Sequence, residues 1–149
     1  MSNAKAIMSD KVTSMSSALD IQEAVEIFIA KKFTTVPVVN GSGDLAGQLT
    51  ESILIRLYIL SKGQPAKFKK LAHCLEHLEK PQFVSPDDSI ASVLKAIMLS
   101  PSKRVFVSKD NNKIMGIVSP KDVLKALAQN DKTADQIKDA MAQSLQPNT

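Results

Sequence analysis

The side chains in this sequence best suited to bind a ligand are Ser119 and Asp122, which enclose Pro120 and Lys121 in the stretch GIVSPKDVL. A Ser followed three positions later by an acid forms a capping box at a helix start, where proline is also well tolerated. The same geometry suits a nucleotide, because a helix N-terminus attracts phosphate and a carboxylate accepts hydrogen bonds from both ribose hydroxyls. Ser119 and Asp122 are therefore predicted to begin a helix and to bind a ligand.

The elements that must position these residues occur twice. When Gly47 is placed on Gly116, 69 positions later, Ile21 falls on Ile90 and Thr50 on Ser119. Apolar residues at helical spacing predict a helix after a Ser17-x-x-Asp20 capping signal, then strands at 36–39 and 45–50 around a turn at 40–44, then an apolar helix at 53–60.

The second copy has the same order of elements. Ser85-Pro86-Asp87-Asp88 precedes a predicted helix, and strands at 105–107 and 114–118 enclose a turn at 110–113 before a helix at 121–129. With a short extended segment before the first helix, each copy reads β-α-β-β-α. We therefore predict an α/β (α+β) fold of two repeats.

The remaining segments set the predicted boundaries. We predict repeat 1 at 1–60, a connecting segment at 61–80, repeat 2 at 81–130 and a C-terminal helix and tail at 131–149. Gly63 and Pro65 interrupt the connecting segment before a short predicted helix at 68–78. The tail has a Thr133 cap and an apolar stripe of Ile137, Met141 and Leu145.

Composition limits the class of protein. The 149 residues are 44% hydrophobic and 23% charged, with a formal net charge of +4, as in an ordinary globular domain. No apolar run reaches the roughly 18 residues that span a bilayer, no secretory signal is evident, and one cysteine, Cys74, fits a reducing compartment. We expect a cytoplasmic protein without membrane association. The sequence has neither a nucleophile-base set nor a phosphate-binding glycine loop, so we do not predict an enzyme.

Two in-phase copies at this spacing resemble a tandem pair of cystathionine-beta-synthase (CBS) domains, the Bateman module. The resemblance implies two β-α-β-β-α CBS repeats packed about a pseudo-two-fold axis, with nucleotide clefts between them and frequent dimerisation through the helices. It also implies a regulatory module that senses AMP, ADP, ATP or S-adenosylmethionine and signals to an attached or partner protein. We expect a homodimer with an adenine nucleotide as ligand, no required cofactor and an unknown regulated protein as a further partner.

The resemblance also assigns roles within the nucleotide site. It places Ser119 and Asp122 in the family pattern Gly-h-h-Ser/Thr-x-x-Asp, in which h is apolar, the Ser or Thr faces phosphate and the Asp binds ribose. The other residues that it implies are the phosphate-binding Lys103, Arg104 and Lys121, the packing residue Ile117, and Thr13, Phe33 and Thr34 around the base. Simpler interpretations are a solvated charge pair for Lys103 and Arg104, a core residue for Phe33 and a solvent-facing Lys121.

The two copies differ at the residues that matter for binding. The first copy has Ile53 where the second has Asp122, and Thr34-Thr35 where the second has Lys103-Arg104. We therefore predict one competent cleft.

Two alternatives remain, and a metal site is not predicted. The apolar helix at 53–60 and the tail fit a ligand-free dimerisation or protein-interaction module. The lysine cluster Lys62, Lys67, Lys69 and Lys70 allows nucleic-acid binding, which we regard as less favoured because the other lysines are dispersed. His73 and His77 lie four positions apart, but no third ligand is evident, so we predict no metal site.

Overall fold

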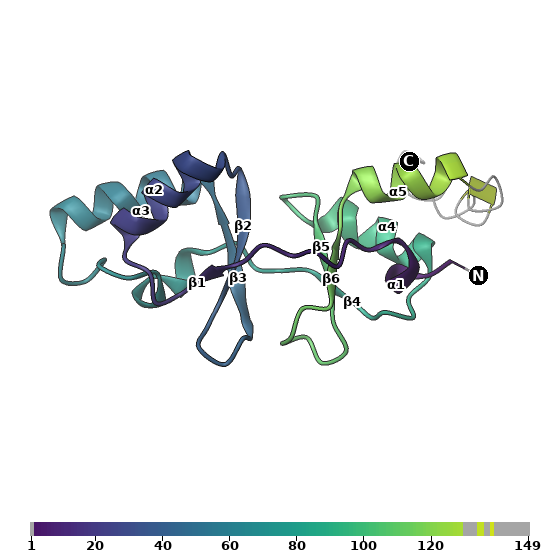
Figure 1. Ribbon diagram of the computed structural model, residues 1–149, viewed down its shortest axis with the longest axis horizontal. Helices are drawn as coiled ribbons and strands as arrows, with labels where there is room; N and C mark the ends of the chain where they lie inside the picture. Colours follow the sequence, from purple (N-terminus) through teal and green to yellow (C-terminus); the bar gives the residue numbers. More distant parts are fainter. Residues whose placement is uncertain (1, 130–133, 136–137, 139–149) are drawn as a thin grey trace, which may run out of the picture. The chain divides into compact units, whose positions relative to one another are not determined.

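The computed structural model describes residues 2–129, 134, 135 and 138 and divides the chain into two compact units (Figure 1). The first-repeat unit is Thr13–Pro81, and the second-repeat unit combines Met1–Val12 with Gln82–Thr149. Thr133, Ile137, Met141 and Leu145 of the predicted tail lie outside the described residues. No helix in the described part is long and apolar enough to cross a bilayer.

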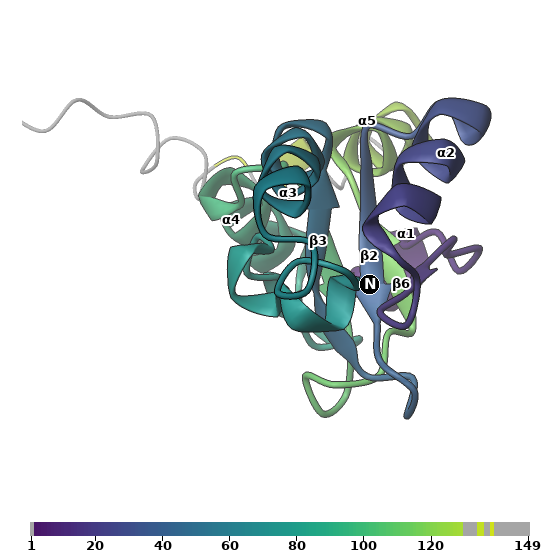
Figure 2. The ribbon, with the colours of Figure 1, turned by 90° about the vertical axis from the view of Figure 1, so that its left-hand side faces the viewer.

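The first-repeat unit is a three-stranded sheet with two helices on one face (Figures 1 and 2). Strand β1 pairs in parallel with β2, and β2 pairs antiparallel with β3. Val38 is fully buried between the sheet and the helices, as a residue on the covered face of a half-buried sheet must be. Its elements are β1 (Met15–Ser16), α2 (Ile21–Lys31), β2 (Thr35–Val39), β3 (Leu45–Thr50) and α3 (Glu51–Gly63).

The second-repeat unit has the same pattern of pairing. Strand β4 pairs in parallel with β5, and β5 pairs antiparallel with β6, so that Val105 lies opposite Val118. The predicted β-α-β-β-α order is thereby confirmed in both repeats, although β6 begins at Gly116 and not at Ile114. Its elements are α1 (Ala4–Ile7), β4 (Phe83–Val84), α4 (Ile90–Leu99), β5 (Val105–Val107), β6 (Gly116–Val118) and α5 (Pro120–Gln129).

The first helix of each repeat begins later than its predicted cap. Asp20 is the N-cap of α2, and its N–H donates to the Glu23 carboxylate at 3.2 Å, whereas Ser17 is buried and its N–H donates to the Val39 carbonyl. Ser89 caps α4 by accepting the Ser92 N–H at 3.2 Å. The stretch from Ser85 is a turn in which the Ser85 N–H donates to the Asp88 carboxylate at 2.9 Å. In both cases the acid or hydroxyl nearest the apolar stripe forms the cap.

The predicted helix at 68–78 is wrong, because this segment contains two 3₁₀ turns, η1 (Leu71–His73) and η2 (Leu75–His77). The buried residues Phe68, Leu71 and Cys74 recur every three positions, which is the period of a 3₁₀ helix. The Leu71 N–H also donates to the Leu19 carbonyl at 3.0 Å, so it is not available for an α-helical bond.

An extra backbone segment pairs with the outer strand of each sheet. Ser9 exchanges two hydrogen bonds with Ile117 of β6, at 2.8 and 2.9 Å, and Glu79 exchanges two with Gln48 of β3, both at 2.9 Å. These segments cross the strands at glycines, as described for the site below.

Candidate functional site

The site is built at the junction between β6 and α5. Ser119 follows the strand directly, and its carbonyl accepts the N–H groups of Asp122 at 3.0 Å and Val123 at 3.3 Å, which begins the helix. Pro120 occupies the first helical position, where a missing N–H leaves no intrahelical bond unmade. The strand-to-helix turn therefore fixes Ser119 and Asp122 at one end of the sheet.

Asp122 accepts two hydrogen bonds from Ser119 on a single oxygen. The Ser119 N–H lies 2.9 Å and the Ser119 hydroxyl 3.0 Å from Oδ2 of Asp122, and both residues are half-buried. Asp122 thus forms its half of the predicted capping box, while the serine hydroxyl donates to the carboxylate. Within the described residues Oδ1 of Asp122 accepts no hydrogen bond, which leaves it available to a hydroxyl group of a ligand.

The strand register brings Arg104 to the same end of the sheet. Because Val105 lies opposite Val118, the adjoining residues Arg104 and Ser119 occupy neighbouring positions at the strand ends. Arg104 is half-buried, and its N–H donates to the hydroxyl of Ser100 at 3.3 Å. An arginine, a helix start and a carboxylate thus belong to one edge of the sheet, and residues of these types can bind a phosphorylated sugar.

Lys103 has a separate structural task. Its backbone is left-handed, with φ at 59°, and its Nζ donates to the Met98 carbonyl in the last turn of α4 at 3.2 Å. A lysine in this position satisfies a carbonyl that the helix end leaves free. Lys121 is exposed on the first turn of α5.

Ile117 is half-buried on β6, opposite Phe106, and both its backbone groups pair with Ser9. Only its side chain is therefore open to a ligand. The neighbouring Gly116 has no room for a side chain, because an added Cβ would lie 2.5 Å from Sδ of Met8 and 2.8 Å from the Ser9 carbonyl oxygen.

Sequence reasoning did not single out Met8 and Ser9 as neighbours of the site. The repeat gives only an approximate signal: Leu78 precedes the second copy much as Met8 precedes the first, although the offset of 69 places Leu78 on Ser9. Leu78 lies over Gly47, where an added Cβ would lie 2.8 Å from the Leu78 Cβ. The glycines that align the two copies, Gly47 and Gly116, are thus the points where another segment of the same unit crosses the strand.

The three residues predicted around the base belong to the first-repeat unit. Thr13 is exposed just before β1, and Thr34 is exposed with its carbonyl accepting the Glu51 N–H at 3.1 Å. Phe33 is half-buried and packs edge-to-face on Phe28, with ring centroids 5.8 Å apart. Phe33 therefore contributes to the core, and a contact between these residues and a base remains a prediction.

The first-repeat counterpart of the site has the cap without the acid. The Thr50 hydroxyl accepts the Ile53 N–H at 3.2 Å and begins α3, while the Ile53 side chain packs against the core of its unit. Gln48, the counterpart of Ile117, is fully buried. The first repeat therefore offers no carboxylate where Asp122 stands in the second.

The two histidines of the connecting segment do not share a helical face. His73 and His77 lie in different 3₁₀ turns, so the common helical face that their spacing suggested does not exist. His73 Nδ1 accepts the Lys70 N–H at 3.4 Å, and His77 Nε2 lies 3.7 Å from Glu76. Among the described residues no three His, Cys, Asp or Glu side chains are grouped to hold a metal ion.

Solved structures of similar fold include several proteins with bound adenine compounds. CBSX2, a CBS-pair protein of Arabidopsis thaliana, was solved in complex with AMP; that complex has a TM-score of 0.68 and 20% identity, covering 87% of this chain and 98% of that one. The CBS domain pair of protein MJ0100, in complex with 5′-methylthioadenosine and S-adenosyl-L-methionine, has a TM-score of 0.59 and 23% identity, covering 87% and 98%. CbpB in complex with c-di-AMP has a TM-score of 0.69 and 17% identity, covering 93% and 90%.

A curated relative is a homoserine O-acetyltransferase of Methanococcoides burtonii, which is 25% identical over 117 residues. The matched region is 78% of this chain but only 22% of that protein's length. The family model of the CBS domain matches residues 4–60 and again residues 76–129, which together make up most of the chain. The chain therefore belongs to the CBS domain family and contains a tandem pair of these domains.

Proposed function

We propose that this chain is a regulatory module that binds one adenine nucleotide or related adenosyl ligand at the start of α5. The observation that carries the proposal is the fixed carboxylate of Asp122, whose Oδ1 is available at the sheet end occupied by Arg104 and Ser119. Bound AMP, S-adenosylmethionine and c-di-AMP in proteins of the same fold support this ligand class.

The proposed roles follow from the chemistry of each group. Asp122 accepts hydrogen bonds from ribose hydroxyls, and Arg104 binds phosphate together with the N-terminal turn of α5. Lys103 and Lys121 have smaller roles, since the Lys103 ammonium must first leave the Met98 carbonyl. Ile117 packs on the sugar or base, and roles for Thr13, Phe33 and Thr34 remain predictions.

Isothermal titration with AMP, ADP, ATP, S-adenosylmethionine and c-di-AMP tests this proposal. We expect saturable binding of at least one of these compounds at one site per chain, and at least about tenfold weaker binding by Asp122→Ala. Absence of binding by all five compounds, or an unchanged affinity in Asp122→Ala, would contradict the site.

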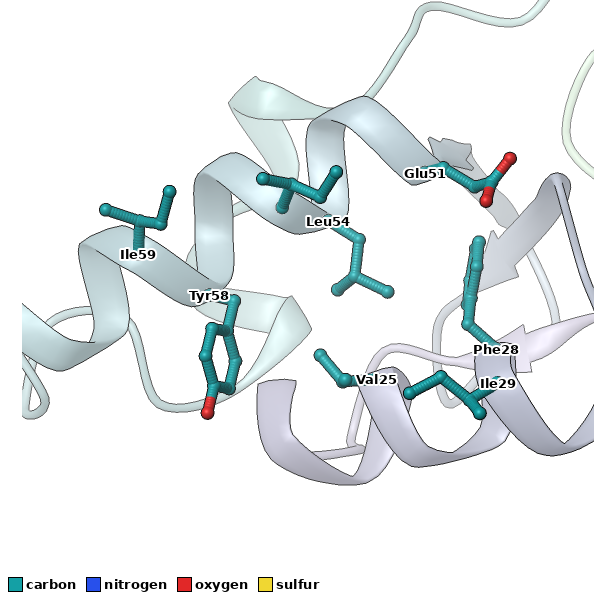
Figure 3. Close-up of a pocket in the computed structure, with 8 residues that line it drawn as sticks. Val25, Phe28, Ile29, Glu51, Leu54, Tyr58 and Ile59 are labelled. Carbon is teal, nitrogen blue, oxygen red and sulfur yellow. The ribbon is translucent and has the colours of Figure 1, made fainter.

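We further propose that the module signals as a non-catalytic homodimer. In the first-repeat unit an apolar cavity of about 270 Å³ lies between α2 and α3, with Val25, Phe28 and Leu54 pointing into the space between the helices (Figure 3). Around it Ile29, Ile55 and Ile59 are 74%, 62% and 64% exposed. Residues 69 positions after Ile29 and Ile55 are Met98 and Leu124, which are 44% and 64% exposed.

Exposed apolar side chains at equivalent positions of both repeats favour a second copy of the chain as the partner, because copies associate through like surfaces. A dimer that forms equally well with and without every nucleotide would favour the alternative, a ligand-free interaction module. Cytoplasmic location remains a prediction that cell fractionation can test.

A further inference from the structure

The positive charge of this protein is concentrated in one segment. Residues 52–75 contain five of the 19 Lys and Arg residues and none of the 15 Asp and Glu residues. The rest of the chain has 14 basic and 15 acidic residues, and so a formal charge of −1. Because the excess positive charge lies in residues 52–75, the positive electrostatic potential is local to this segment and is not spread over the whole protein.

Four lysines of this segment are held on a well-anchored turn. Lys62 lies in the last turn of α3, and Lys67, Lys69 and Lys70 lie just before η1, all exposed. Between them Phe68 is only 5% exposed, and the Lys69 carbonyl accepts the Ile21 N–H of α2 at 2.9 Å. The backbone of the turn is therefore positioned before any partner binds, which lowers the cost of association.

These four lysines are not neutralised within the described part of the chain. None of them forms an ion pair with a carboxylate there. Lys62 lies over the Tyr58 ring, with Nζ 4.8 Å from the ring centroid, and Lys67 lies over the Phe68 ring at 5.5 Å. Four ammonium groups that are close in sequence and form no ion pair in the described part are therefore available to an anionic partner.

A cavity of about 260 Å³ lies against this turn. Lys62, Lys69 and Phe68 line it, together with Asp20 and Gln22 from the start of α2. It is smaller than the roughly 300 to 1,000 Å³ of pockets that hold drug-sized ligands, so its size suits one side chain of a larger partner.

We propose that residues 62–70 bind an acidic segment of a partner protein, with one Asp or Glu side chain of that segment in the cavity beside Lys62 and Lys69. Nucleic acid fits the surface less well. Phe68 is buried and Lys62 lies over the Tyr58 ring, so neither of these rings is well placed for base stacking, and residues 62–70 contain no arginine. The proposal is independent of nucleotide binding at Asp122.

The test uses fluorescence anisotropy of a labelled oligoglutamate peptide with the full chain. We expect saturable binding that weakens when salt is raised from about 0.05 M to about 0.5 M. Lys62→Glu/Lys69→Glu is expected to lower the affinity at least about tenfold, because like charges then face each other. The matched control, Lys95→Glu/Lys125→Glu, makes the same charge change at exposed lysines of α4 and α5 and should retain affinity within about twofold.

Three results would overturn the proposal. The first is no binding of the peptide by the unaltered protein. The second is an equal loss of peptide affinity in both double variants, which would mean that only the net charge of the protein matters. The third is tighter binding of a single-stranded oligonucleotide of equal charge, which would identify nucleic acid as the preferred partner. Titration of the Lys62→Glu/Lys69→Glu variant with the adenine compounds shows whether the nucleotide site is intact. It therefore separates failure of the proposed peptide surface from failure of the nucleotide site.

Discussion

Both hydrogen-bond donors of Ser119 converge on one oxygen of Asp122, with the N–H at 2.9 Å and the hydroxyl at 3.0 Å from Oδ2. The helix cap therefore uses one carboxylate oxygen and leaves the other to a ligand. Capping and binding are compatible in this arrangement, because they require different atoms of the same side chain. A substitution that preserves one of these functions and removes the other can separate them.

Asp122→Asn is such a substitution. The asparagine oxygen can still accept the Ser119 N–H, so we expect the free energy of unfolding to fall by less than about 1 kcal/mol. Affinity for the adenine ligand should fall at least about tenfold, because hydrogen bonds to a charged acceptor are roughly twice as strong as neutral ones. Urea unfolding and titration calorimetry measure the two effects.

Asp88→Asn provides the matched control for Asp122. Asp88 also accepts an N–H from the residue three positions earlier, Ser85 at 2.9 Å, but in the turn before α4. Its replacement should leave ligand affinity unchanged. Equal losses of affinity in the two variants would mean that Asp122 acts only through local structure.

Gly116→Ala and Gly47→Ala should each destabilise the fold. The new Cβ at position 116 would lie 2.5 Å from the Met8 sulfur, and that at position 47 would lie 2.8 Å from the Leu78 Cβ. Overpacking of this kind typically costs about 1–3 kcal/mol, which urea unfolding can measure. Gly41→Ala is the control, since nothing lies within 4 Å of its added Cβ; a loss of the same size there would contradict the steric explanation.

The turn before β6 should respond to acid. Hydrogen bonds from the N–H groups of Lys113 and Asn112 lower the pKa of Asp110 below its usual 3.8. Because the folded pKa is the lower one, the stabilising effect is complete above the unfolded pKa of about 3.9 and is lost as pH falls through the folded value. An NMR titration should therefore place the Asp110 midpoint below 3.8, with the Asn112 and Lys113 amide signals following it.

The first repeat offers an internal control for that titration. Its turn uses the Asn40 side chain, whose oxygen accepts the N–H groups of Ser42 and Asp44 at 3.0 Å, and an amide does not titrate. The Ser42 amide signal should therefore move little over the same range. An Asp110 midpoint at or above the usual value would show that its hydrogen bonds do not stabilise the ionised carboxylate.

Ile55→Glu should dissociate the proposed dimer. Ile55 is 62% exposed beside the apolar cavity of α2 and α3, so a carboxylate costs little in the monomer but would be desolvated in an interface. Analytical ultracentrifugation should show at least about a tenfold increase in the dimer dissociation constant. Lys95→Glu, at an exposed position of α4, is the control. A monomeric unaltered protein would refute the dimer itself.

The sequence predicted the repeat, the strand pairs and the two helices of each repeat, because apolar periodicity is a local signal and occurs in both copies. The short helix α1 and the 3₁₀ turns at 71–77 were not predicted. Helix starts were less predictable. Ser17 and Ser85 both lie at suitable distances before an apolar stripe, but strand pairing uses Ser17 and a turn uses Ser85, which leaves Asp20 and Ser89 as the caps. The bond that competes for Ser17 comes from the distant Val39, which no local window contains, whereas Ser85 is drawn into a turn by Asp88, three positions later.

The candidate site was predictable to a similar degree. The cap formed by Ser119 and Asp122 follows from spacing alone, and the place of Arg104 beside it follows from the strand register. The contact of Lys103 with Met98 and the crossing of Met8 over Gly116 depend on a left-handed residue and on a distant segment. Neither feature produces a periodic signal.

The pairing of Ser9 with Ile117 has a consequence for biosynthesis. Residues 2–9 leave the ribosome before the whole of Thr13–Pro81, and their partners in β6 leave after it. The first-repeat unit is continuous in sequence and can fold during translation, whereas Ser9 must wait for the last strand of the second-repeat unit before it can pair with Ile117. Until then Met8 lacks the strand position at Gly116 against which it packs, and a nascent-chain chaperone that binds short apolar segments can act in this interval.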